Sequence, residues 1–309
     1  MNQNLRQCFN SLTVVGTLKS KEVKFGTTAN GDSTISLDLV VVSNDVDKVH
    51  ENKIRLWAKN TSKLYNSYVT VANEYKTVDN DGAANADRIK ITGSLEMNEY
   101  FNTNANELKT YNNLRGVFIN RLDKDLVDEV GAVVECVITG HVDEISKEGV
   151  PTGRKKVNIL TVGYNSTIHE IQNVVVEKEL AQQFTQMYGI NSTGKLYLKI
   201  NNYSEKAEEK EQTQPQIGFG NTLSNMPDTV VKNYINEIVI VGGDMPSVAN
   251  KFTVEEINEM IKRRELSRNE KMNSVPSTPP APTGFGTGFG DTQSQTQSTG
   301  TFDNGSLPF

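Results

Sequence analysis

Residues 53–59 have the sequence Lys-Ile-Arg-Leu-Trp-Ala-Lys, in which apolar side chains alternate with cationic or aromatic ones. Successive side chains of a β-strand point to opposite faces, so the apolar residues Ile54, Leu56 and Ala58 predict a face that suits a barrel interior. The remaining four side chains form the outward face: Lys53, Arg55, Trp57 and Lys59. The only tryptophan of the chain is therefore expected to point outward among three cations.

An outward indole in such surroundings favours contact with a nucleic acid. Stacking of one base on an aromatic ring contributes about 1–3 kcal/mol, and neighbouring cations contact the phosphates of the same strand. The alternative is that Trp57 packs under a loop or helix and that the surrounding cations are merely solvated. We expect this strand to bind single-stranded DNA.

The segments around this strand predict a small β-barrel. Two further strands precede it, a short amphipathic helix follows it at 62–75, and a long hairpin comes next. In the helix, Leu64, Tyr68, Val71 and Tyr75 recur at spacings of three and four. The strands are expected at 12–18, 34–43, 53–59, 88–101 and 108–122. Three strands, a helix and two strands is the order of a five-stranded OB barrel.

A similar order recurs downstream, with Gly140 at the place of Gly16. Its strands are expected at 136–142, 157–164, 168–176, 195–203 and 231–241, with a helix at 179–188 and a polar insertion at 204–227. Thr253 as N-cap and acidic residues in the first turn predict a final helix. The sequence therefore predicts an all-β chain with two tandem five-stranded OB-fold barrels (1–125 and 130–246), a helix (251–272) and a disordered tail (273–309), the tail being rich in Pro, Gly, Ser, Thr and Gln.

The hairpin and the second copy supply further candidate binding residues. On the hairpin, the candidates are outward cations and aromatic residues near the tip: Arg88, Lys90, Tyr100, Phe101 and Tyr111. In the second copy, the alternation over 195–203 points a weaker set outward: Lys195, Tyr197, Lys199 and Tyr203. A barrel used for self-association or partner binding is the alternative for this second set.

Bulk properties restrict the class of protein. The net charge is −6, but residues 1–125 are nearly neutral, with about 16 basic against about 15 acidic residues, and the acid lies downstream. Only the local placement of cations matters for binding a single strand. The sequence shows no secretion signal and no apolar stretch long enough to cross a bilayer, so a cytoplasmic location is expected. Cys8 and Cys136 are expected to be inert thiols in a reducing compartment.

Catalytic motifs are absent from the sequence. It contains no phosphate-binding loop, no Gly-x-Ser-x-Gly, no His-Glu-x-x-His and no cysteine cluster. His50, His141 and His169 are isolated, and the carboxylates around 79–87 are typical of a solvated loop. We therefore expect a protein that is not an enzyme and has no cofactor and no metal.

The stretch from Leu12 to Leu122 resembles the OB domain of bacterial and phage single-stranded-DNA-binding proteins. The similarity lies in Val-Val-Gly-Thr-Leu at 14–18, the Asn-Gly turn at 30–31, Arg-Leu-Trp-Ala-Lys at 55–59, Lys-Ile-Thr-Gly-Ser-Leu at 90–95 and the aromatic hairpin. The resemblance implies that Trp57, and Tyr100 or Phe101, stack on bases. Two barrels in one chain resemble a phage version more than the bacterial single-barrel pattern.

The C-terminal residues add to this resemblance. The family ends in a flexible tail and a short acidic tip that closes in Pro-Phe, and this sequence ends in Phe-Asp-Asn-Gly-Ser-Leu-Pro-Phe at 302–309. A terminal ring and carboxylate on a flexible tether suit an apolar pocket beside a basic residue. The tip residues expected to bind proteins are Asp303, Leu307, Pro308 and Phe309. Asp303 is the only acid in the tip, where the family tends to have several.

Together these features predict sequence-independent binding and protection of single-stranded DNA in replication, recombination or repair. The setting would be the cytoplasm of a bacterium or of a phage-infected host, with the tip recruiting replication or recombination proteins. The alternative is a tandem-barrel adaptor or structural protein that binds proteins rather than DNA. RNA is a third ligand that stacking alone does not distinguish. The oligomeric state stays open.

Overall fold

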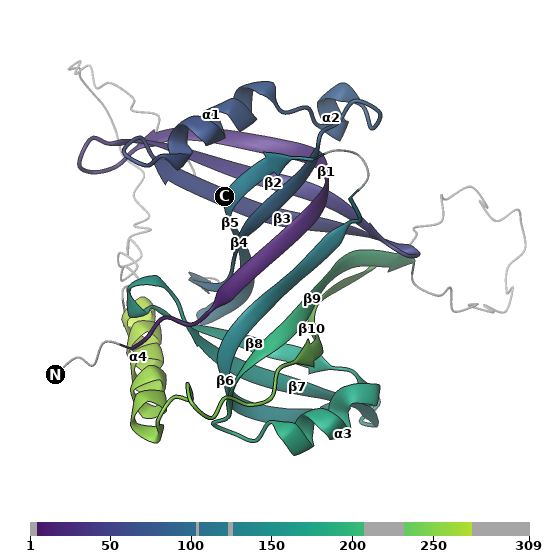
Figure 1. The fold of residues 1–309 in the computed structure, drawn as a ribbon, viewed down its shortest axis with the longest axis vertical. Coiled ribbons are helices and arrows are strands. Elements are labelled where there is room, and N and C mark those ends of the chain that lie inside the picture. The colour runs from purple at the N-terminus through teal and green to yellow at the C-terminus, as the bar shows by residue number, and fades with distance from the viewer. Residues whose placement is uncertain (1–4, 103–104, 123–125, 207–231, 274–309) are drawn as a thin grey trace, which may run out of the picture. The chain divides into compact units, whose positions relative to one another are not determined.

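The computed structural model describes residues 5–102, 105–122, 126–206 and 232–273. Strands dominate these residues (Figure 1). The strands are β1 (Asn10–Thr27), β2 (Ser33–Asp45), β3 (Lys48–Lys59), β4 (Arg88–Asn102), β5 (Glu107–Arg121), β6 (Glu129–Ile145), β7 (Pro151–Val162), β8 (Ile168–Val176), β9 (Thr193–Lys206) and β10 (Lys232–Gly243). The helices are α1 (Leu64–Glu74), α2 (Val78–Asp81), α3 (Lys178–Met187) and α4 (Val254–Asn273), with a 3₁₀ turn η1 (Tyr164–Ser166). The predicted mostly-β chain with a helix near its C-terminal end is confirmed.

The first five strands form a closed circuit of hydrogen-bonded pairs. β1 pairs with β2, β2 with β3, β3 in parallel with β5, β5 with β4, and β4 with β1 again. The predicted alternation places Ile54, Leu56 and Ala58 of β3 in the interior, each at most 3% exposed. Helix α1 connects β3 to β4 along the chain, as predicted, and its buried residues are Tyr68 and Val71.

The last five strands repeat this circuit. β6 pairs with β7, β7 with β8, β8 in parallel with β10, β10 with β9, and β9 with β6. Helix α3 connects β8 to β9, at the place that α1 has between β3 and β4. We refer to β1–β5 with α1 and α2 as the first half, and to β6–β10 with α3 as the second half.

The glycines that match in the two sequence copies do different work. A Cβ atom at Gly16 would lie 2.2 Å from the carbonyl oxygen of Val42, so only glycine permits this close approach of β1 to β2. A Cβ atom at Gly140 would meet nothing within 4 Å. The sequence pattern therefore places both glycines correctly in a strand, but only Gly16 is required for steric reasons.

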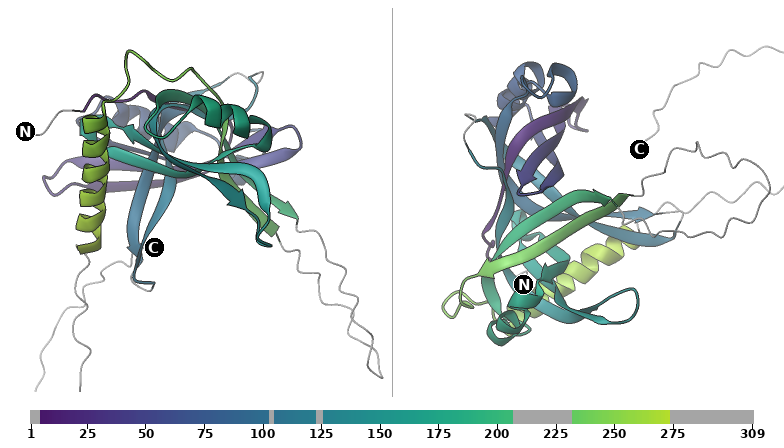
Figure 2. Two further views of the ribbon diagram at one scale, coloured as in Figure 1. Left: turned by 90° about the horizontal axis from the view of Figure 1, so that it is seen from below. Right: turned by 90° about the vertical axis from the view of Figure 1, so that its right-hand side faces the viewer.

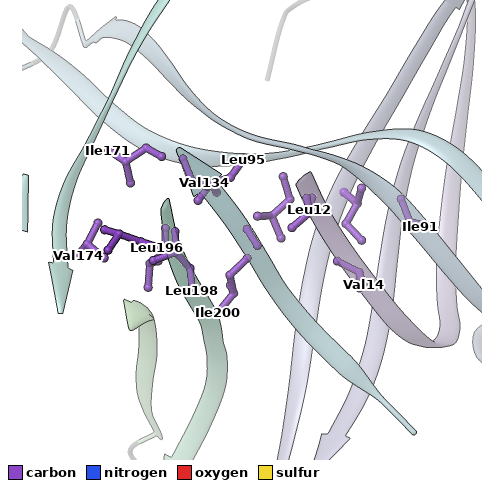
Figure 3. Packing of buried hydrophobic residues seen from close by; sticks show 14 of the residues in the cluster. Leu12, Val14, Ile91, Leu95, Val134, Ile171, Val174, Leu196, Leu198 and Ile200 are labelled. Atoms are coloured by element: carbon purple, nitrogen blue, oxygen red, sulfur yellow. The ribbon is translucent and has the colours of Figure 1, made fainter. Parts of the chain in front are cut away.

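The two halves are joined by strand pairing and by a common core. β1 pairs with β6 from Asn10↔Val134 to Val15↔Glu129, and β3 meets β9 at His50↔Tyr203. Figure 3 shows apolar side chains from β1 and β4 and from β6, β8 and β9 in one buried cluster. Strands from one half therefore cover apolar surface of the other.

Helix α4 follows the second half and contacts both halves. Its N-terminus is a capping box: the Glu256 N–H donates to Thr253 Oγ1 (3.2 Å), and the Thr253 N–H donates to Glu256 Oε2 (2.8 Å). Ile257 and Met260 are buried in a second apolar cluster, and the helix also runs beside β8 and the β4–β5 hairpin (Figure 2). Among the described helices, none has the length and apolarity needed to span a membrane.

Some sequence expectations differ from the structure or fall outside it. Residues 78–81, interpreted as loop, form α2, because the Thr77 side chain accepts the Asn80 N–H and caps a short helix. The expected polar insertion (204–227) and disordered tail (273–309) lie outside the described residues, apart from 204–206 at the end of β9 and Asn273 at the end of α4.

Candidate nucleic-acid interface

The outer face of β3 carries the predicted row of cations around an aromatic ring. Trp57 is 48% exposed, and its register partner on β2 is Ser36, whose small side chain leaves the indole uncovered on that side. Lys53 and Arg55 are exposed, and Lys59 is half-buried. The structure therefore keeps the indole outside the apolar interior, which is the condition for stacking on a base.

The cations of this face have acidic neighbours. Arg55 donates from Nε to Asp38 Oδ1 (2.6 Å) and from Nη2 to Asp38 Oδ2 (3.0 Å). These bonds to Arg55 hold the pKa of the Asp38 carboxyl below its usual value. Lys59 Nζ lies 3.5 Å from an Asp32 carboxylate oxygen, whereas Lys53 has no ion pair within the described residues. A phosphate that reaches Arg55 must compete with Asp38.

Sequence reasoning missed Asp38, although a signal for it existed. On β2 the buried residues Ile35, Leu37, Leu39 and Val41 alternate with outward ones, so Asp38 had to share the outer face with β3. The pairing register that sets Asp38 opposite Arg55 is a property of the folded sheet.

A groove of about 530 Å³ lies over the outer face of β2 and β3. Lys53 and Arg55 line it from β3, Ser20 and Glu22 from β1, and Asn98, Tyr111 and Asn113 from the β4–β5 hairpin. We call this space the β3 groove. It brings the hairpin and the cationic part of β3 to one surface, as a strand-binding site requires. Trp57 and Lys59 do not line this groove but follow Arg55 on the same outer face of β3.

The hairpin aromatic residues divide between two faces. Tyr100 and Tyr111 are 52% and 48% exposed, and their rings lie edge to face with centroids 6.1 Å apart. Phe101 is the next residue after Tyr100, so it points to the opposite face of β4, where it is half-buried. Tyr111 borders the β3 groove directly and Tyr100 packs against it.

The two candidate cations at the start of β4 lie away from the groove. Arg88 donates to Asp128 Oδ1 (2.5 Å) and to the carbonyl oxygen of Leu126 (2.6 Å), so it anchors the segment that leads into β6. Lys90 is half-buried on β4, between Val15 of β1 and Asn120 of β5. Neither lines the β3 groove.

The outward residues of β9 are engaged within the chain. Lys199 forms an ion pair with Asp45, and Tyr203 accepts a hydrogen bond from Lys48 Nζ (2.6 Å). The Tyr203 ring also meets His50 edge to face at 5.2 Å. Asp45, Lys48 and His50 belong to the first half, so this part of β9 holds the two halves together.

The other two β9 candidates are also occupied. The Tyr197 hydroxyl donates to Asp244 Oδ1 (2.5 Å). The Lys195 ammonium lies 5.2 Å from the centroid of the Phe9 ring. Sequence alternation gave the direction of these side chains correctly, but gave no sign of the groups that cover them.

Acidic side chains surround the cations of the second half. Arg154 lies within 3.4 Å of carboxylates from Glu144, Glu177 and Glu237. Lys155 pairs with Asp143 (2.7 Å). The basic run at 154–156 therefore has no free charge to offer to a phosphate.

Residues 9–274, which make up most of the chain, match the YorF family. The chain belongs to the YorF family. No curated protein matches its sequence.

Solved structures similar to this YorF protein include single-stranded DNA-binding proteins of low sequence identity. The wild-type protein from Thermus aquaticus is 12% identical, with 80% of this chain and 98% of that chain covered and a TM-score of 0.47. The mitochondrial protein from S. cerevisiae is 16% identical, with 37% and 96% covered and a TM-score of 0.26. One from Streptomyces coelicolor is 17% identical, with 36% and 93% covered and a TM-score of 0.25. The predicted resemblance to single-stranded DNA-binding proteins is therefore also found among solved structures.

The remaining residues singled out in the sequence of this YorF protein are the two cysteines, any potential metal ligands and the C-terminal tip. Cys8 and Cys136 are free and buried, and burial raises the pKa of both thiols. Within the described ranges, no group of three or more His, Cys, Asp or Glu residues could hold a metal ion. The predicted protein-binding tip, Asp303 and Leu307–Phe309, lies outside the described residues.

Proposed function

We propose that this YorF protein binds single-stranded DNA along the β3 groove without sequence preference and without catalysing a reaction. Bases would stack on Trp57 and on Tyr111, with Tyr100 supporting Tyr111. Lys53, and Arg55 after its release from Asp38, would contact the phosphates, and Lys59 would extend this cationic row. Each closed circuit of five strands is, in this proposal, an OB-type barrel, the first in residues 1–125 and the second in residues 130–246.

The observation that carries the proposal is the half-exposed indole on a strand whose neighbouring outward residues are cations. Protein folding normally buries a tryptophan, and an indole left half in water beside a groove is a surface available to a ligand. Aromatic rings within a cationic groove are the combination that single strands need. The proposal omits Arg88, Lys195, Tyr197, Lys199 and Tyr203 because other groups of the chain occupy them. It omits Lys90 because this side chain is half-buried on β4 and belongs neither to the lining of the groove nor to β3.

The cellular role follows from the same chemistry. A protein that covers single strands regardless of sequence protects them and keeps them unpaired during replication, recombination or repair. The tip, Asp303 with Leu307, Pro308 and Phe309, would recruit partner proteins in a bacterial or phage-infected cytoplasm. Deletion of 307–309 should leave DNA affinity unchanged and abolish this recruitment, as pull-down with and without the tip would measure.

The test of DNA binding is fluorescence of the single tryptophan. Oligo-dT at low salt should quench Trp57 strongly, and the affinity should fall as salt rises because phosphate contacts release counterions. A duplex of equal length is the control, since its paired bases are not free to stack. Absence of both quenching and any change in the anisotropy of labelled oligo-dT would refute the proposal and favour an adaptor that binds proteins. Oligo-rU in the same titration separates DNA from RNA preference.

A further inference from the structure

A second hollow, of about 390 Å³, borders the β4–β5 hairpin on the side of the second half. Six residues on three strands matter for its chemistry: Thr110, Tyr111 and Asn112 of β5, Gln172 and Asn173 of β8, and Asn236 of β10. Tyr111 lines both this hollow and the β3 groove. The two spaces therefore meet at one exposed ring.

The hairpin separates the two spaces because its side chains alternate. Tyr111 and Asn113 point toward the β3 groove, while Thr110 and Asn112 point toward the second half. β3 pairs with β5 only at Leu114 and Arg115, so over 107–113 β5 pairs with β4 alone within the described chain. Tyr111 therefore lies on this unpaired edge, between the β3 groove and the second hollow.

A β-bulge turns two neighbouring amide residues toward the hollow. Val157 pairs with Val174 and Ile159 with Ile171, so Gln172 and Asn173 together oppose the single residue Asn158. Asn173 has a positive φ of 56°, and its N–H donates to Asn158 Oδ1 (3.0 Å), which fixes the bulge. Regular alternation would have sent one of the two amides to the other face.

Neutral hydrogen-bonding side chains make up most of the lining of the hollow, which also includes Lys156, Glu237, Val175 and Ile238. Within the described residues, no other group of the chain bonds to the side-chain amides of Asn112, Gln172, Asn173 and Asn236. The charged residues at its border are paired: Lys156 with Glu144 (3.2 Å) and Glu237 with Arg154 (2.8 Å). Side-chain amides present a donor and an acceptor side by side, which matches the donor and acceptor pattern of base edges.

We propose that this hollow reads the base edges of nucleotides that leave the β3 groove over Tyr111. This inference rests on the proposed function and deepens it, because it assigns base-edge hydrogen bonds to the second half and stacking with charge contacts to the first. Binding in the β3 groove stays indifferent to sequence, whereas binding in the second hollow depends on the presence of a base.

The experiment extends an oligonucleotide with and without bases. The starting probe is the shortest oligo-dT that fully quenches Trp57, and extensions are added at either end as thymidines or as abasic sugar–phosphates. For the base-bearing extension at one end, we expect an affinity gain of roughly 5- to 150-fold over the abasic extension, as for one good amide–base pair. The double variant Gln172→Ala/Asn236→Ala should abolish this difference and leave the affinity of the starting probe unchanged. Gln182→Ala, an exposed amide on α3 outside the hollow, is the control.

Two results would overturn the inference while the β3 groove stands. One is an equal gain from the base-bearing and abasic extensions in the wild-type chain, and the other is a full base-dependent gain in the double variant. Failure of the starting probe to bind would instead refute the proposed function, and the inference with it. Circular dichroism of the double variant checks that it folds.

Discussion

The two halves of the molecule have the same circuit of strand pairs and different outer surfaces. In the first half, the third strand of the circuit presents Trp57 between cations, and Lys53 has no ion pair within the described residues. In the second half, the basic run at 154–156 is paired: three carboxylates surround Arg154, and Lys155 and Lys156 pair with Asp143 and Glu144. The second hollow beside it is lined by four side-chain amides together with two hydroxyl residues, the paired Lys156 and Glu237, and two apolar residues.

This difference shows that the scaffold and the surface chemistry are specified separately. Strand order follows from inward apolar residues, which both halves have, and these residues place no demand on the outward ones. A run of basic residues becomes a phosphate site only where the fold leaves the cations without acidic partners. The first half meets this condition in part, and the second half does not.

The largest expected effect concerns Arg264 of α4, whose side chain bonds carboxylates of both halves. Its guanidinium bonds Glu99 of β4 in the first half and Glu170 of β8 in the second (Nη1–Oε2 and Nε–Oε2, both 3.1 Å). Its side chain is 7% exposed and that of Glu99 is fully buried. Arg264→Ala should lower the free energy of unfolding by about 3 kcal/mol, the low end for breaking a buried ion pair, because Lys271 Nζ still lies 3.2 Å from the Glu99 carboxylate.

Urea denaturation measures this change. The control is Arg268→Ala on the exposed side of the same helix, which should cost little. Equal stability of the two variants would show that α4 does not brace the hairpin. Since Tyr100 and Tyr111 lie on that hairpin, the loss of Arg264 should also weaken DNA binding in the β3 groove.

The next effect in size is loss of the exposed indole. Trp57→Ala should reduce the affinity for oligo-dT roughly 5- to 150-fold, which corresponds to about 1–3 kcal/mol for one stacked base. Anisotropy of labelled oligo-dT measures this without the tryptophan signal. Tyr197→Ala is the matched change in the second half, and because its hydroxyl already bonds Asp244, it should leave affinity nearly unchanged. A larger loss for Tyr197→Ala would reverse the assignment of the two halves.

The sequence was sufficient for the strands, for the three longer helices α1, α3 and α4, and for the direction of most side chains, but not for the short helix α2. On β3, alternation alone predicted that Ile54 and Leu56 are buried and that Trp57 is exposed, because strand geometry has a strict period of two. The capping pattern predicted α4 for a similarly local reason, since Thr253 and Glu256 satisfy the first backbone N–H groups of the helix.

Contacts between distant segments were beyond sequence reasoning. Alternation on β9 predicted that Lys199 and Tyr203 point outward, yet it could not show that β3 would meet β9 there. The bulge at Gln172 and Asn173 likewise depends on the register between β7 and β8. Strand register and the contacts between the two halves depend on many weak interactions across the sheet, so no short sequence motif predicts them.

Two buried histidines at the junctions of the halves predict a pH dependence of stability. Burial lowers the pKa of His50, which contacts β9, and of His169 on β8, below the ordinary value of 6.5. The unfolded chain therefore binds protons that the folded chain does not, and the stability present above pH 6.5 is lost as the pH falls toward the folded-state pKa values. The slope should approach about 1.4 kcal/mol per pH unit for each histidine at most.

Unfolding free energies between pH 5 and pH 8 measure this slope. His50→Gln and His169→Gln should each flatten this slope. A wild-type slope of zero across this range would mean that the junctions open to water before the histidines titrate.

The smallest expected effect tests how far acidic partners restrict the first half. Asp38→Asn removes the carboxylate that Arg55 bonds twice, so the guanidinium becomes available to a phosphate. Because an ion pair this exposed contributes about 0–1 kcal/mol, the affinity for oligo-dT should rise by at most about fivefold. The dependence of log affinity on log salt should steepen by about 0.7, the value for one further phosphate contact on a single strand. Asp143→Asn frees Lys155 in the second half in the same way and should change neither quantity, unless DNA also follows that surface.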